Sequence, residues 1–439
     1  MGGEMNQEKE ILPNKFIRNI LLILFIDVLL FQNPLSRLLG LFSYTDEVIA
    51  VAGIGAYVYR RMFVKRQVND LRPVVFLCGF VLTGVLGNVI FQYQPVKLVF
   101  IDLLTNIKFF FAVLFGEQLE TTIRDQETRK LISLNLRIFS AAIFILLIIE
   151  QVFHIFPEFD IRHGIRSACL IYEHPTYLAA SLSAAIAFLT CFYERKNRIY
   201  IIFNLITVLF TMRTKAFLAA AAYCAVVYYV IIKKREPSWK EVLAASIGAL
   251  ALGARKVYYY FIFLDMKGAR SILTRTAFRI MKDYFPIGTG FGTYGSHVAG
   301  QYYSPVYVKY GFESYYELRN SEIGTFFDDS FWPIIIGQTG LIGTVFYFLL
   351  LLFLFWRVWN TKKVGIYEFA GGMFCMAYLF ISSLGESAFN NALACPFAVL
   401  IGVMLASLDR SGKMGGQHLN RSRRTGRPRH KTELIMVRR

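Results

Sequence analysis

Two cations lie in a very short turn between two apolar segments. The sequence Thr211-Met-Arg213-Thr-Lys215 separates apolar runs at 199–212 and 214–232. Because positive charges are disfavoured in short translocated turns of membrane proteins, Arg213 and Lys215 indicate an anionic ligand. The alternative is that both side chains extend to the phosphates of the outer lipid leaflet, as long cationic side chains do.

A second group of cations recurs at helical spacing further along the chain. Arg275, Arg279 and Lys282 occupy positions i, i+4 and i+7, which predicts a short amphipathic helix with one cationic stripe. A glycine run at 288–292 follows this stripe. Because no apolar strand precedes the run, it does not match a P-loop or a dinucleotide fingerprint. We expect these glycines to form left-handed turns.

Several titratable side chains stand beside these cations. His297 lies near five tyrosines, and it is either an ordinary surface residue or a group that handles sugars and phosphates. Asp328 and Asp329 precede an apolar run at 330–356, and at least one of them is expected to cap that helix. Charged residues also occur within or at the ends of apolar runs, where they are costly in lipid: Asp27, Asp102, Lys108, Glu150 and Glu386. We expect a structural role for the first three.

The composition determines which elements can position these residues. The 439 residues are 55% hydrophobic and only 18% charged, with a mean hydropathy of +0.45. Soluble domains carry roughly a quarter charged residues, so a conventional cytosolic enzyme is excluded and an all-α polytopic membrane bundle is predicted. Twelve apolar runs approach spanning length: 16–32, 44–59, 73–91, 98–116, 138–156, 174–193, 199–212, 214–232, 241–264, 330–356, 366–386 and 389–408.

The distribution of Lys and Arg predicts the orientation of these spans. With the N-terminus inside, 32 of the 48 cations fall in cytoplasmic segments, 15 outside and one, Lys108, within a span. The rule that cytoplasmic loops are richer in Lys and Arg then places both termini in the cytoplasm. The predicted organisation is a first membrane block of about nine spans (1–264), a long, partly helical extracytoplasmic loop (265–329), a second block of three spans (330–408) and a basic tail (409–439).

The tail is expected to be disordered because it is polar and poor in aromatic residues. It either binds anionic lipid headgroups or serves only to fix the topology, and nucleic acid is not an expected partner. The six cysteines show no metal spacing, and all but Cys169 sit in apolar runs. We therefore infer neither a disulfide framework nor a metal site.

Four short motifs share one order and one predicted side of the membrane. They are Glu173-His174-Pro175-Thr176-Tyr177, the Thr211 to Lys215 turn, Arg279 followed after ten residues by Gly290, and Phe327-Asp328-Asp329 with Gly337-Gln-Thr-Gly340-Leu-Ile-Gly343. Together they resemble the bacterial O-antigen polymerase and O-antigen ligase superfamily of multi-span glycosyltransferases. The resemblance covers about residues 173–343, and the first five spans match only in hydropathy.

The resemblance implies a polysaccharide repeat-unit polymerase in the bacterial plasma membrane. Such an enzyme transfers a glycan from undecaprenyl diphosphate to a sugar hydroxyl of a second lipid-linked repeat unit at the outer face, without a cofactor or a metal. The catalytic residues would be Arg213, which neutralises the departing diphosphate, Arg279, and His297 as the base. The substrate-binding residues would be Lys215, Arg275, Arg166, Glu173, His174, Tyr177, Asp328 and Asp329.

The partners implied are membrane lipids and the flippase and chain-length regulator of the same pathway. Arg213-Thr-Lys215 departs from the Ser-Arg-Gly form of ligases, which favours polymerase over ligase. The alternatives are a ligase-type transferase, a flippase or exporter of lipid-linked oligosaccharides, and a non-catalytic membrane scaffold. Transporters place their charges near the middle of the membrane, whereas these cations cluster outside.

Overall fold

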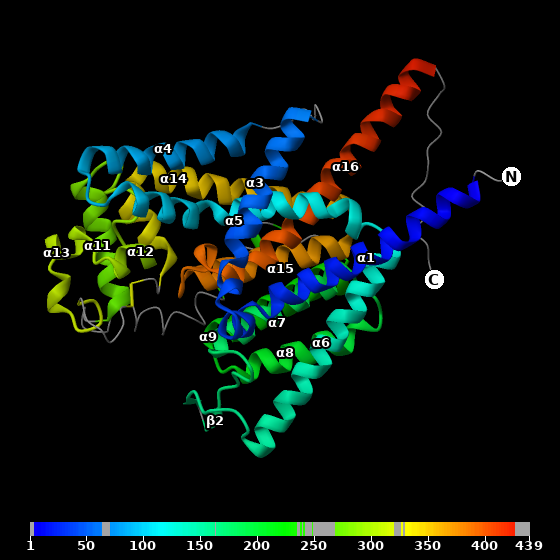
Figure 1. The fold of residues 1–439 in the computed structure, drawn as a ribbon, viewed down its shortest axis with the longest axis horizontal. Helices are drawn as coiled ribbons and strands as arrows, with labels where there is room; N and C mark the ends of the chain where they lie inside the picture. Colours follow the sequence, from blue (N-terminus) through cyan, green and yellow to red (C-terminus); the bar gives the residue numbers. More distant parts are fainter. Residues whose placement is uncertain are drawn as a thin grey trace.

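Long apolar helices lie side by side in the computed structural model, and a smaller helical unit covers one end of them (Figure 1). The structure describes residues 4–63, 71–162, 164–234, 238, 240–241, 248, 268–319, 326–327 and 330–425. Within these residues the protein is almost entirely helical, and its two strands are only two residues long each. The predicted all-α class is therefore confirmed.

The long helices are α1 (Glu4–Leu30), α3 (Thr45–Phe63), α4 (Arg72–Phe91), α5 (Val96–Ile123), α6 (Gln126–Phe153), α7 (Pro175–Cys191), α8 (Asn197–Phe210), α9 (Thr214–Val226), α14 (Phe331–Trp359), α15 (Ile366–Ser383) and α16 (Cys395–Thr425). The helix α9 continues as a π-helical segment, η2 (Val227–Ile232). Shorter helices are α2 (Gln32–Leu38), α11 (Ala269–Asp283), α12 (His297–Gln301) and α13 (Pro305–Lys309). Single 3-10 turns are η1 (Gly40–Tyr44), η4 (Phe312–Ser314), η5 (Asn360–Lys363), η6 (Ala388–Asn390) and η7 (Ala392–Ala394).

The number of membrane-spanning helices differs from the predicted twelve. Among the described residues, eight helices are long and apolar enough to cross a membrane, or nine if the bent pair α1 and α2 counts as one span. At 1.5 Å per residue, the 17 residues of α7 and the 14 of α8 reach about 25 and 21 Å. Both are shorter than a hydrocarbon core of about 30 Å. The predicted run 241–264 lies almost wholly outside the described residues.

The first predicted span, 16–32, ends at a sharp bend close to Pro34. α1 and α2 meet at an angle of 84°, and Pro34 stands in the first turn of α2. Proline lacks the N–H that would continue the α1 ladder, and its ring clashes with the preceding turn. The chain therefore turns at Phe31 and runs along the end of the bundle.

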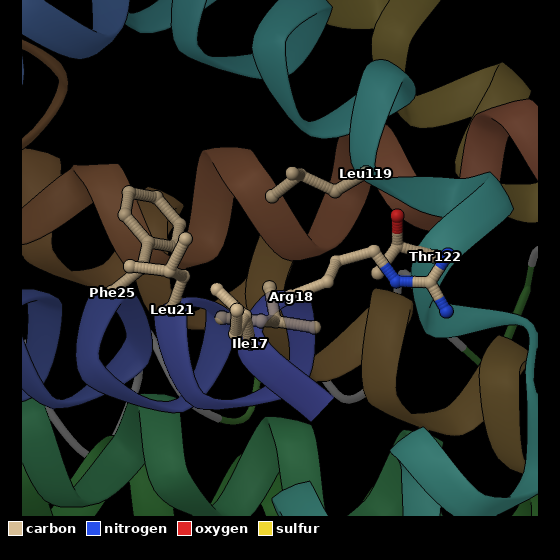
Figure 2. A pocket seen from close by; sticks show the side chains of 7 residues that line it. Ile17, Arg18, Leu21, Phe25, Leu119 and Thr122 are labelled. Carbon is tan, nitrogen blue, oxygen red and sulfur yellow. The ribbon is translucent and has the colours of Figure 1, made fainter. Parts of the chain in front are cut away.

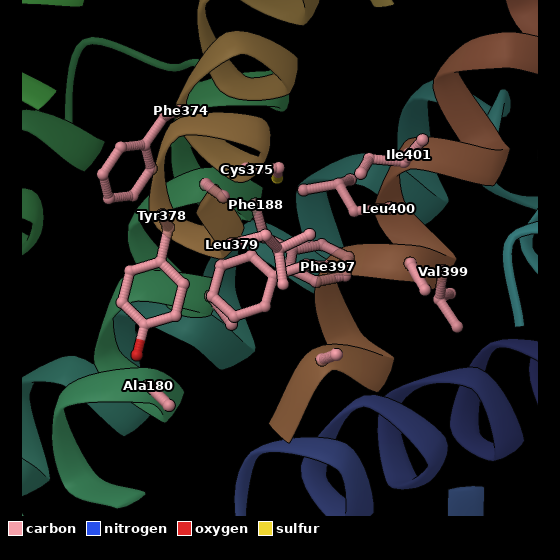
Figure 3. Packing of buried hydrophobic residues seen from close by; sticks show 14 of the residues in the cluster. Ala180, Phe188, Phe374, Cys375, Tyr378, Leu379, Phe397, Val399, Leu400 and Ile401 are labelled. Atoms are coloured by element: carbon pink, nitrogen blue, oxygen red, sulfur yellow. The ribbon is translucent and has the colours of Figure 1, made fainter. Parts of the chain in front are cut away.

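The core of the bundle is built around α7. All of its residues except Tyr177 are buried, as expected for a helix that is apolar on every side. Figure 3 shows Phe188 of α7 packed among Phe374, Tyr378 and Phe397 of α15 and α16. Small residues allow still closer contact elsewhere in the bundle. A Cβ on Gly402 of α16 would lie 2.0 Å from a backbone oxygen of α5.

Charged side chains gather at both ends of the bundle. The amino end of α1 and the carboxyl end of α16 lie at the same end (Figure 1). The ion pairs at this end include Lys15–Asp125 (3.1 Å), Arg129–Glu368 (3.3 Å), Arg137–Glu194 (3.4 Å), Arg357–Asp409 (2.5 Å) and Arg410–Glu120 (2.8 Å). These cations all belong to the set assigned to the cytoplasm from the sequence.

The structure differs from the prediction of a disordered tail. α16 extends to Thr425, so residues 409–425 are helical, and 426–439 lie outside the described residues. The first turn beyond the apolar run is held in place because Asp409 and Arg410 pair with Arg357 and Glu120. These two contacts tie the start of the basic segment to α14 and α5.

Residues 269–327 contribute a separate apolar core, which we call the outer unit. α11, α12, α13 and η4 surround buried aromatic residues that include Tyr294, Tyr307 and Phe312. Ring stacking continues to Phe327, whose ring centroid lies 4.1 Å from that of Tyr307. The long predicted loop is therefore folded and partly helical in its described residues.

The glycine run fastens the outer unit to the bundle. Gly288, Gly290 and Gly292 have φ angles of +75°, +96° and +74°, which confirms the predicted left-handed turns. Asn88 of α4 holds the backbone of Phe291 by two hydrogen bonds, donating to its oxygen (2.9 Å) and accepting from its nitrogen (2.8 Å). The buried carboxylate of Asp102 on α5 accepts from the nitrogen of Gly292 at 2.8 Å.

Candidate functional site

The turn between α8 and α9 places Arg213 at the start of α9, at the end of the bundle opposite the chain termini. Arg213 takes an extended conformation as the N-cap residue, and it is only 9% exposed. Its Nη2 lies 3.3 Å from Oδ2 of Asp160, and its guanidinium lies over the ring of Phe159, 5.0 Å from the centroid. The side chain is therefore packed against the loop between α6 and α7.

That loop is braced by a small hairpin. β1 (Ile161–Arg162) and β2 (Ile165–Arg166) pair in antiparallel register. Arg162 donates from Nε to Oδ2 of Asp160 at 2.8 Å, so Asp160 lies between two guanidinium groups. Burial opposes ionisation of Asp160, but Ser167, Arg162 and Arg213 together hold the pKa of its carboxyl below its ordinary value.

His174 caps the amino end of α7 in the same region. Its Nδ1 accepts a hydrogen bond from the Thr176 backbone nitrogen at 3.0 Å. Its ring packs edge-on against that of Phe159, with 4.6 Å between the ring centroids. Burial, followed by the charges of Arg213 and Lys215, lowers the pKa of His174 to about 4. At neutral pH the ring is therefore uncharged. Because Nδ1 accepts, Nε2 carries the proton and is a donor rather than a base.

Lys215 is the second residue of α9 and forms an ion pair with Glu386, which follows the end of α15. Arg270, near the amino end of α11, is close enough to Lys215 for their charges to interact, as is Arg213. The charge of Arg162 also acts on Arg213. We call these four cations, Arg162, Arg213, Lys215 and Arg270, the outer cation cluster.

Within the described residues, three of the four cations of the outer cation cluster pair with Asp160 or Glu386, and Arg213 still has an unused donor. Burial and then the charge of Arg162 lower the pKa of Arg213 from its usual value. The Nε of Arg213 is buried and has no hydrogen-bond partner within the described part of the chain. Buried donors are usually satisfied, and a guanidinium offers five N–H groups in a fork that matches phosphate oxygens. The geometry therefore suits a phosphate-bearing ligand.

Two other residues predicted to bind substrate have protein partners instead. Arg166 lies 3.5 Å from Glu150 and 3.6 Å from Glu158, so it fastens the loop to the end of α6. Glu173 interacts with Asn33 of α2, accepting from its side chain at 3.4 Å and donating its backbone N–H to it at 2.9 Å. Tyr177 remains beside the site, with its ring 6.0 Å from that of His174.

The remaining predicted residues are not part of this cluster. Arg279 and His297 are exposed, and no contact joins either of them to the outer cation cluster within the described residues. Arg279 lies nine residues beyond Arg270 on α11, which is about 13 Å along the helix axis. His297 starts α12, whose other side chains turn into the outer unit. Arg275 lies between Arg270 and Arg279 on α11 and is half-buried. Asp328 and Asp329 lie outside the described residues.

Sequence reasoning missed four members of the site: Phe159, Asp160, Arg162 and Arg270. Asp160 and Phe159 meet Arg213 only because the loop between α6 and α7 folds back over the turn. Arg270 reaches Lys215 across more than fifty residues. No local pattern marks any of these residues, although Arg162 and Arg270 belong to the outside cations that the charge distribution singles out.

A pocket at the opposite end of the bundle is separate from this site. It has a volume of about 390 Å³ and is lined by Ile17, Arg18, Leu21, Leu22, Phe25, Leu119 and Thr122 (Figure 2). Its walls come from α1 and α5 and are mostly apolar. It shares no residue with the outer cation cluster.

Comparisons with known proteins identify no relative of this chain. No protein-family model, no curated protein and no solved structure matches the chain.

Proposed function

We propose that this protein is a polysaccharide repeat-unit polymerase that uses an undecaprenyl-diphosphate-linked glycan as donor. The acceptor is a sugar hydroxyl of a second lipid-linked repeat unit at the outer face of the bacterial plasma membrane. The observation that carries the proposal is the outer cation cluster, in which the described residues place Arg162, Arg213, Lys215 and Arg270 near the carboxylates of Asp160 and Glu386. The motif resemblance supplies the chemical identity of the donor.

The chemistry of the donor fits the cluster. In this transfer the acceptor oxygen attacks C1 of the donor sugar, the C1–O bond to the diphosphate breaks, and undecaprenyl diphosphate departs with the bonding electrons. Negative charge develops on the leaving group, and fixed cations aimed at that position lower the barrier. Arg213 contributes a guanidinium that is already desolvated and partly unpaired, and the neutral His174 can donate a hydrogen bond from Nε2.

Glu386 is the proposed proton acceptor. Its carboxylate pairs with Lys215 in the absence of substrate. When the ammonium group of Lys215 turns to the diphosphate, Glu386 loses its counter-ion and becomes more basic beside the acceptor hydroxyl. We expect Glu386→Gln, which keeps the shape and a hydrogen-bonding oxygen, to lower turnover strongly while leaving donor affinity nearly unchanged.

The decisive experiment is reconstitution of the full chain with lipid-linked repeat units isolated from the same cells. A ladder of lengthened glycans formed without ATP or an ion gradient supports the proposal. Movement of the repeat unit across the bilayer without new glycosidic bonds would identify a flippase instead. Lengthening should disappear in Arg213→Ala and persist in Arg195→Gln, which removes an exposed cation from the turn between α7 and α8. Long polymer in the Arg213→Ala sample would refute the assignment.

A further inference from the structure

One face of α11 combines cations with an exposed aromatic ring. At 100° per residue, Arg275, Phe278, Arg279 and Lys282 fall within a sector of roughly 100°. The opposite face of the helix enters the apolar core of the outer unit through Leu273, Ala277 and Ile280. The sequence therefore makes α11 amphipathic, but its outward face is not simply polar.

Two cations of this face have no ion-pair or hydrogen-bond partner in the part of the chain that the structure describes. Arg279 and Lys282 are exposed, and no ion pair or hydrogen bond joins either side chain to a residue of the described ranges. Phe278 is 51% exposed, and Phe285, just beyond the helix, is 67% exposed. Exposed aromatic rings beside unpaired cations are typical of helices that lie in the interface between lipid and water.

The position of α11 relative to α4 supports the same reading. Tyr284, which follows α11, packs edge-on against Phe91 at the end of α4 (4.7 Å) and shares a hydrogen bond of 2.5 Å with Tyr93. Val89 and Ile90, in the last turn of α4, are more than half exposed. The lipid-facing surface of α4 thus leads directly to the carboxyl end of α11.

The direction of α11 is also suitable for an interfacial helix. In Figure 1, α4 and α14 run along the long axis of the molecule, whereas α11 runs across that axis at their outer ends. A helix that crosses the bundle axis beside the end of a spanning helix lies in the plane of the membrane. Its outward face is then available to lipid headgroups.

We propose that the Arg275, Phe278, Arg279 and Lys282 face of α11 binds anionic phospholipid headgroups of the outer leaflet and so anchors the outer unit to the membrane. The cations attract the phosphates, and the rings of Phe278 and Phe285 enter the interface. This assigns Arg275 and Arg279 to lipid rather than to the glycan donor, and it does not depend on the proposed enzymatic activity.

The test places a fluorophore on this face in the full chain. A variant with Cys78 and Cys224, the two exposed cysteines, changed to Ala receives Phe278→Cys and is labelled. The matched control is Val308→Cys on α13, which is similarly exposed (53%) and lies farther out along the long axis than α11 (Figure 1). Both are reconstituted in vesicles of three parts phosphatidylcholine to one part phosphatidylglycerol that contain a headgroup spin-labelled lipid.

We expect the lipid spin label to quench the probe at 278 at least about twofold more than the probe at 308, and aqueous iodide to show the reverse order. Replacing phosphatidylglycerol with phosphatidylcholine, or adding Arg279→Gln and Lys282→Gln, should reduce this difference. Helix content and gel-filtration profile show whether each variant is folded. Equal quenching at both positions would overturn the proposal. So would unchanged lipid quenching in the charge variant accompanied by weaker binding of the lipid-linked glycan.

Discussion

Replacement of Arg213 by Lys separates a phosphate-binding fork from a simple positive charge. The variant keeps a cation at the start of α9, where the guanidinium now contacts Asp160 and the ring of Phe159. It removes the planar arrangement of donors, including the Nε that has no partner among the described residues. If Arg213 only stabilises the loop, Lys should largely substitute for it, whereas a diphosphate-binding role requires the fork.

The contacts of Arg213 predict a small loss of stability and a large loss of kcat in Arg213→Lys. The ion pair with Asp160, whose side chain is 27% exposed, is worth about 0–1 kcal/mol. The interaction with Phe159 adds about 0.5–1 kcal/mol. Since Lys retains part of both, the free energy of unfolding should fall by no more than about 1 kcal/mol, or a Tm decrease of about 4 °C or less. Loss of a fixed donor to a developing anion should lower kcat by about 10²–10³.

The assay compares initial rates of glycan lengthening and Tm for the same reconstituted samples. Arg166→Lys is the matched control, because Arg166 lies in the loop that packs against Arg213 but is occupied by Glu150 and Glu158. We expect the control to lose stability with little change in kcat. Nearly wild-type rates in Arg213→Lys would refute a fork-dependent role, and equal rate losses in the two variants would show that both act only by shaping the loop.

Three further substitutions test the fold and the electrostatics. Asn88→Leu leaves the buried backbone groups of Phe291 without their partners, so thermal unfolding should show a loss of about 2–5 kcal/mol. Gly402→Ala forces a methyl group against the α5 backbone and should cost about 1–3 kcal/mol, whereas Gly55→Ala, with open space around it, should leave Tm nearly unchanged. Because folding lowers the pKa of His174 to about 4, the unfolded chain binds its proton first, near pH 6.5. Stability should therefore fall as the pH decreases from about 6.5 toward 4, and His174→Asn, which keeps a capping oxygen, should flatten this part of the Tm profile.

Structural features that depend only on residues close together in the sequence could be predicted. Helical spacing gave the α11 stripe, glycine content gave the left-handed turns, and the charge distribution separated two ends that the ion pairs also separate. The count of twelve spans is not confirmed among the described residues, and α7 shows one reason. α7 is too short to cross a membrane alone, yet it is apolar all round because other helices enclose it. A hydropathy pattern shows that such a helix is buried, but it does not distinguish burial by lipid from burial by other helices.

The composition of the site depended on contacts between distant segments. Arg213 and Lys215 were recognised because two cations in a short outer turn violate a local rule. Their neighbours Asp160 and Glu386 stand in unrelated loops, and only the fold brings them together. Arg279 differs from them, because its spacing correctly predicted a helix, but its side chain is exposed and no contact in the described residues joins it to the cluster. Periodicity assigns residues to one face of a helix without saying which neighbour that face meets.

The positive charge of the outer cation cluster has no evident use in the fold itself. The turn before α9 is already closed by hydrogen bonds, from Oγ1 of Thr211 to Val208 (2.6 Å) and from the nitrogen of Met212 to Leu209 (3.0 Å). Burial of the Arg213 guanidinium, and then its repulsion by Arg162, raise the free energy of the charged form, so the pKa of Arg213 is lowered. Apolar side chains could close the same turn without this cost. Under the proposed function, a bound diphosphate would reduce the repulsion between Arg162 and Arg213 and accept a hydrogen bond from Nε of Arg213.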